Sequence, residues 1–105
     1  MRKVIYLDGS KADLKEIAAY IAESSGSVET AERFVASLRG QCRKIAGLTT
    51  LLGRPRDDLR AGVRAFPFKS YVLIFRYEKD RLELVNILHG QRDLAAFYHD
   101  QPISP

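Results

Sequence analysis

The chain has 105 residues, of which 46% are hydrophobic and 29% are charged. This composition is typical of one folded globular domain and excludes a chain that is disordered throughout. It has no apolar run of the roughly 20 residues that a membrane span requires, and its N-terminal apolar stretch is too short for a signal peptide. A single cysteine excludes an internal disulfide, and we expect a cytoplasmic protein.

Positive charge is concentrated in the middle of the chain. The formal net charge is +4, and between Arg39 and Arg76 the only acidic residues are Asp57 and Asp58. Such a run is either a solvated basic face or an electropositive surface for an acidic partner or a phosphate backbone. Composition alone leaves both interpretations open.

The N-terminal half predicts one strand and two helices. Residues 4–7 form a short apolar run, which indicates a strand that joins the later sheet. Ser10 is the predicted N-cap of the first helix, with Asp13 in the capping-box position. A break at residues 24–27 ends this helix, and Ser27 or its neighbour starts a second, so the two form an antiparallel hairpin. The apolar faces are predicted to be Leu14, Ile17, Ala18 and Ile21 in the first helix, and Ala31, Phe34, Val35, Leu38, Cys42 and Ile45 in the second.

The C-terminal half predicts a three-stranded antiparallel meander. Gly47 is the predicted C′ residue of the second helix, and residues 48–62, which have no regular period, are predicted to form a surface loop. The strands are residues 63–68, 71–77 and 82–88, followed by a short helix at residues 94–98. The middle strand is apolar on both faces except for Arg76, which indicates a strand covered on both sides.

The predicted fold is therefore α+β, in the order β-α-α-β-β-β with a short terminal helix. One domain is expected over residues 1–98, with a frayed tail at 99–105. The residues expected in the core are Phe34, Leu38, Ile17, Ile21, Leu73, Phe75, Val85 and Ile87.

Several signatures of chemistry are missing from the sequence. There is no glycine-rich phosphate loop, no Cys/His metal spacing and no serine elbow, so we expect neither a metal nor a cofactor. Cys42 falls in the apolar stripe of the second helix and is expected to be a buried small hydrophobe.

A polar cluster follows the last strand. His89, Arg92, Asp93 and Tyr98 lie at one predicted corner of the sheet. They are either an Arg–Asp pair that caps the strand beside a covering tyrosine, or a site for phosphate or for a partner's carboxylates.

Two segments, RAFPFKSYVLIFRY and ILHGQRDL, resemble the ParE-type toxins of the RelE/ParE superfamily, the toxin halves of bacterial type II toxin–antitoxin modules. The resemblance implies a non-enzymatic toxin that inhibits DNA gyrase and blocks replication. It also implies a ParD-like antitoxin, which binds operator DNA itself and neutralises the toxin in a hetero-oligomer by placing an acidic C-terminal tail in a groove. The residues expected to contact target or antitoxin are Arg64, Lys69, Arg76, His89, Arg92, Asp93 and Tyr98.

The RelE branch of the same superfamily, which cleaves messenger RNA on the ribosome without a metal, is the alternative. Arg92 and Tyr98 match RelE positions that would hold the phosphate and transfer a proton. Val72 stands where RelE has an arginine, and the paired lysines of RelE have no clear counterpart. The ParE branch is therefore the better fit.

Overall fold

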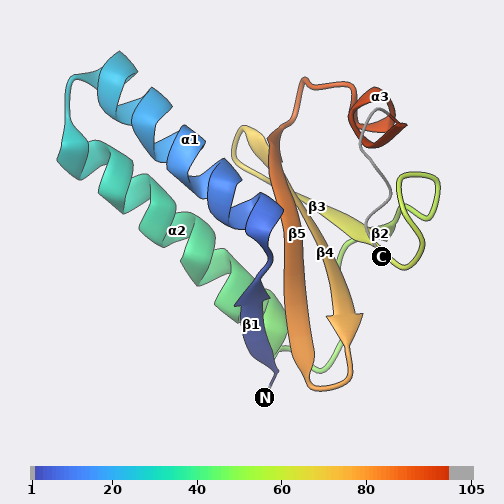
Figure 1. Ribbon diagram of the computed structural model, residues 1–105. Coiled ribbons are helices and arrows are strands. Elements are labelled where there is room, and N and C mark those ends of the chain that lie inside the picture. Colours follow the sequence, from blue (N-terminus) through green and yellow to red (C-terminus); the bar gives the residue numbers. More distant parts are fainter. Residues whose placement is uncertain (1, 100–105) are drawn as a thin grey trace.

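The computed structural model describes residues 2–99, which form two helices packed on one face of a five-stranded sheet and a short helix on the other face (Figure 1). The elements are β1 (Lys3–Tyr6), α1 (Asp8–Ser25), α2 (Val28–Gly47), β2 (Arg54–Pro55), β3 (Arg64–Phe68), β4 (Tyr71–Glu78), β5 (Arg81–His89) and α3 (Leu94–His99). The α+β class and the order of the predicted elements are confirmed. Of the predicted tail, only His99 is described, and it ends α3.

The strands are ordered β1-β5-β4-β3-β2. The meander β3-β4-β5 is antiparallel as predicted, whereas β1 pairs in parallel with β5. The sheet is therefore mixed. The prediction that residues 48–62 are wholly irregular is wrong at one point, because β2 pairs with β3 inside this segment.

The helix ends show where local sequence signals hold and where they fail. Ser27 is the N-cap of α2, and its side chain accepts a hydrogen bond from the Thr30 N–H (3.1 Å). The prediction of Ser10 as N-cap of α1 is wrong, because the helix begins at Asp8 and the fully buried Ser10 hydroxyl donates to the Leu7 carbonyl (2.8 Å). Gly47 is likewise the last residue of α2 instead of C′.

The sheet buries both of its faces. The helical hairpin covers one face, with Leu38, Leu73 and Phe75 fully enclosed. A second cluster on the other face, around Ile74 and Val63, is covered by α3 and the loop before β3. The core prediction is confirmed for Leu38, Ile17, Leu73, Phe75, Val85 and Ile87, while Phe34 and Ile21 are only partly buried.

A β-bulge in β5 changes which face of the sheet the later residues of this strand occupy. Ile74 pairs with Asn86 but Phe75 pairs with Leu84, so Val85 is an extra residue. Side chains three residues apart in a regular strand point to opposite faces, yet Leu84 and Ile87 both pack against the helices. Beyond the bulge, Asn86 therefore lies opposite Ile74 of the second core cluster, on the face where Tyr98 reaches it.

Candidate functional site

The structure separates the predicted contact residues into different places. The Arg64 guanidinium donates to the carbonyls of Leu52 (2.7 Å) and Gly53 (3.0 Å), so it holds the segment that follows α2. The Arg76 Nε donates to Glu83 Oε1 (2.7 Å), and Arg81 pairs with the second carboxylate oxygen of Glu83. Both predicted arginines are engaged within the chain.

Lys69 and His89 do come together at one end of the sheet. Lys69 lies in the β3–β4 turn at a φ of 57°, and the neighbouring Ser70 carbonyl accepts a hydrogen bond from the Gly90 N–H (2.8 Å). This bond ties the turn to the segment after β5, where His89 Nδ1 accepts from the Gln91 N–H (3.2 Å). Two segments that are distant in sequence thus form a single corner.

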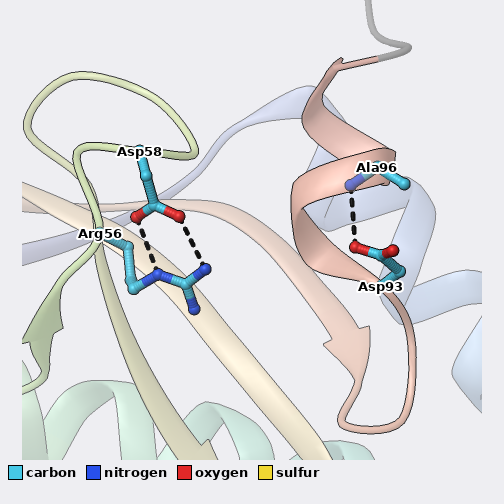
Figure 2. A network of polar contacts seen from close by, with 4 residues as sticks. All are labelled: Arg56, Asp58, Asp93 and Ala96. Carbon is cyan, nitrogen blue, oxygen red and sulfur yellow. Dashed lines mark hydrogen bonds and ion pairs between the residues drawn. The ribbon is translucent and has the colours of Figure 1, made fainter.

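Arg92 and Asp93 do not form the ion pair that the sequence allowed. Asp93 Oδ1 accepts a hydrogen bond from the Ala96 N–H (3.0 Å) and so caps α3 (Figure 2). The Arg92 guanidinium lies 4.6 Å from the centre of the Phe97 ring. Figure 2 also shows Arg56, which forms two hydrogen bonds with the Asp58 carboxylate and is therefore not a free cation of the basic run.

Tyr98 is buried and belongs to a chain of polar contacts. Its hydroxyl donates to Asn86 Oδ1 (2.7 Å), and Asn86 Nδ2 donates to Asp13 Oδ2 (2.9 Å). The same Asp13 oxygen accepts the Ile87 N–H (2.8 Å), a backbone donor beyond the part of β5 that β1 covers. Burial raises the pKa of the Tyr98 hydroxyl well above its usual value and also raises the pKa of Asp13. The chain of contacts joins α3, β5 and α1, and Asp13 takes part in it instead of capping its own helix.

Tyr98→Phe is expected to lower the free energy of unfolding by about 1–3 kcal/mol, because it leaves the buried Asn86 carbonyl oxygen without a donor. Urea denaturation of the wild type and the variant measures the change. The matched control is Tyr20→Phe, whose side chain is 66% exposed and whose hydroxyl should contribute little. Equal stabilities of the two variants would mean that the Tyr98–Asn86 bond contributes nothing.

A cleft of about 370 Å³ lies between α1 and the corner. One wall carries Asp13, Glu16 and Tyr20 of α1, and the other carries Tyr71, His89 and Arg92. The α1 wall carries two carboxylates and the other wall carries the Arg92 guanidinium. Aromatic side chains line both walls. This arrangement suits a segment of mixed charge with an apolar side chain.

A second and more basic surface lies on the other side of α1. A hollow of about 580 Å³ along β1 adjoins one of about 440 Å³ between β1 and the helices, and one of about 540 Å³ between the helices. Arg39 lines all three. We call this surface the basic furrow, and its charged residues are Arg2, Lys3, Lys11, Lys15, Arg39, Arg43 and Glu32.

The inner part of the basic furrow is apolar. Small side chains of both helices line the hollow between them, among them Ala18, Ala22, Ala31 and Ala36. The Arg39 guanidinium lies 4.7 Å from the centre of the Tyr6 ring, which keeps it at the junction of the hollows. Because β1 is the first strand in the sheet order, its outer edge is also available for pairing. The basic run of the sequence includes Arg39 and Arg43. It does not include the other cations of the furrow, which come from β1, the residue before it and α1: Arg2, Lys3, Lys11 and Lys15.

Residues 2–99 include no group of three or more His, Cys, Asp or Glu side chains that could hold a metal ion. No helix in this part of the chain is long and apolar enough to cross a membrane. The Cys42 thiol is buried as predicted, and burial raises its pKa, which disfavours the reactive thiolate.

Comparison with known proteins points to one family. The family described as "ParE toxin of type II toxin-antitoxin system, parDE" matches residues 4–94. Toxin ParE3 of Caulobacter vibrioides is 28% identical over 96 residues, which cover 91% of this chain and 94% of that protein. Toxin ParE1 of the same organism is 32% identical over 87 residues, which cover 83% of this chain and 88% of that protein.

A solved structure shares the fold. A chain of the chromosomal ParDE toxin–antitoxin system from P. aeruginosa superimposes with a TM-score of 0.73 at 21% identity. The match covers 85% of this chain and 96% of that one.

Proposed function

The chain belongs to the ParE toxin family of parDE type II toxin–antitoxin systems, and from this premise we propose that it inhibits DNA gyrase by binding and that a ParD-like antitoxin neutralises it. Inhibition of gyrase would block replication and would place the protein in the cytoplasm. We expect the antitoxin, and not this chain, to recognise operator DNA, and the two to form a hetero-oligomer.

The basic furrow is the observation that supports neutralisation by an acidic antitoxin tail. Six lysines and arginines line it and Glu32 is its one carboxylate. An acidic segment would be attracted from a distance and would lose little to repulsion at contact. The apolar hollow between α1 and α2 fits one face of a helix, and the outer edge of β1 fits an extended strand.

Tyr98 favours action by binding over cleavage of RNA. A general acid must reach the leaving group, but this hydroxyl is buried, donates to Asn86 and has a raised pKa. Val72, at the position where RelE has an arginine, packs against the second core cluster. Of the two residues that match RelE positions, Arg92 and Tyr98, only Arg92 is exposed, and one cation does not supply both a proton donor and a base.

The test is to add the purified chain to gyrase with relaxed DNA and, separately, to ribosomes programmed with messenger RNA. We expect supercoiling to be inhibited and messenger RNA to remain intact. Addition of the antitoxin encoded beside this chain should restore supercoiling. Cleaved messenger RNA with normal supercoiling would assign the chain to the RelE type of activity and contradict the proposal.

A further inference from the structure

An aromatic cluster forms the corner described above. The Phe34 and Tyr71 ring centres are 5.6 Å apart, and the Tyr71 and His89 ring centres are 5.5 Å apart in an edge-to-face arrangement. These rings come from α2, β4 and β5, and Tyr20 of α1 lines the adjoining cleft. We call this surface the aromatic corner, and it comprises Tyr20, Phe34, Lys69, Tyr71, His89 and Arg92.

The two cations of the aromatic corner lie over aromatic rings, and Arg92 also shares the cleft with Asp13 and Glu16. Lys69 Nζ lies 3.2 Å from the Ser37 hydroxyl oxygen and 5.2 Å from the centre of the Phe34 ring. Arg92 lies over the Phe97 ring. Neither of them forms an ion pair within residues 2–99. Both are therefore positioned by contacts within the chain while their charge is available to a partner's carboxylate.

The aromatic corner and the basic furrow do not overlap. None of the residues that line the cleft at the corner lines any of the three hollows of the furrow. The two surfaces also differ in charge, because Asp13 and Glu16 form one wall of the cleft. A uniformly acidic tail fits the furrow and would be repelled by this wall, and so would a nucleic-acid phosphate backbone.

We propose that the aromatic corner is the surface that binds the target enzyme, separately from the surface that binds the antitoxin. The segment that it accepts is a protein segment with an apolar side chain in the cleft, a carboxylate near Arg92 and Lys69, and a basic group near Glu16. Tyrosine and arginine are among the residues on which binding energy concentrates in protein interfaces, and Tyr20 is 66% exposed. This inference rests on the proposed function, because it names the site through which gyrase would be inhibited.

The test uses Tyr20→Ala and Arg92→Glu in the full chain. For each, the concentration that half-inhibits supercoiling by the gyrase holoenzyme should rise at least about tenfold. Affinity for the antitoxin should stay within about twofold of the wild type, since neither residue lines the furrow. Both side chains are exposed, so melting temperatures should remain close to that of the wild type.

The control is Lys79→Glu, which makes the same change of charge in the β4–β5 turn at the opposite end of the sheet. It should inhibit gyrase as the wild type does. If the wild type inhibits gyrase and the two corner variants inhibit it equally well, this inference is overturned while the proposed function stands. If the wild type does not inhibit gyrase, the proposed function fails and this inference fails with it.

Two further results would assign the corner to another occupant. A loss of antitoxin affinity as large as the loss of inhibition would mean that the antitoxin binds there. A gel shift of short duplex DNA by the wild type alone, abolished in Arg92→Glu but not in Lys79→Glu, would mean that the corner binds nucleic acid. Either result overturns the inference.

Discussion

Leu73→Ala is expected to lower the free energy of unfolding by about 2–5 kcal/mol, which is a large fraction of the roughly 5–15 kcal/mol that stabilises a typical domain. Leu73 is 0% exposed in the second strand of the meander, where it packs in the cluster between the sheet and the helical hairpin. Truncation removes buried methyl groups and leaves a cavity that close-packed neighbours fill only in part. Urea denaturation followed by circular dichroism measures the change.

Leu51→Ala is the matched control for Leu73→Ala. It removes the same atoms from a side chain that is 49% exposed in the segment after α2. Its midpoint of unfolding should move little. If Leu73→Ala shifted stability by only a few tenths of a kcal/mol, the position of Leu73 in the core would be wrong.

The double variant Arg39→Glu/Arg43→Glu is expected to weaken antitoxin binding at least about 100-fold. Both residues line the hollow along β1, and Arg39 lies where the three hollows of the furrow meet. Reversal of both charges replaces attraction of an acidic tail with repulsion, and close charge pairs across interfaces are each coupled by about 1.5 kcal/mol or more. Surface plasmon resonance should show most of the change in the association rate and a weaker dependence of that rate on salt.

The control for the furrow must carry the same net charge, because long-range steering depends on the charge of the whole molecule. Arg33→Glu/Lys79→Glu meets this condition with two exposed residues that line none of the hollows. It should keep most of the wild-type affinity. Equal losses in the two double variants would mean that net charge, and not the furrow, governs the association.

Most of the fold could be predicted because it follows from short-range periodicity. The apolar stripes of α1 and α2 and the strand at residues 71–77, which is apolar except for Arg76, are visible in the sequence, and each was found in the structure. The start of α1 could not be found in this way. Ser10 and Asp13 form a good local capping signal, but Asp13 accepts hydrogen bonds from Asn86 and Ile87, which are far away in the sequence. The hydrogen bonds from these distant residues override the local capping preference of Asp13. No short stretch of the sequence contains both Asp13 and its partners.

The candidate surfaces were harder to predict because each is assembled from several elements. The sequence pointed to Lys69, His89 and Arg92, which do meet, but not to Tyr20 or Phe34, whose helical positions are equally typical of ordinary amphipathic faces. The basic run was a weaker guide. Its residues are distributed over different faces once the chain folds, and Arg56, Arg64 and Arg76 are engaged within the chain.

Because β1 pairs in parallel with β5, the sheet can be completed only after β5 has been synthesised. The helical hairpin and the meander consist of contacts between neighbours in sequence, so each can form as soon as its own residues are available. β1 is translated first but hydrogen-bonds to the last strand, from Lys3 opposite Arg81 to Tyr6 opposite Leu84. Its docking closes the longest loop in the fold and must wait until β5 has left the ribosome. A nascent chain therefore cannot complete the β1 side of the furrow before β5 has emerged, and the edge that we propose for the antitoxin is among the last surfaces to form.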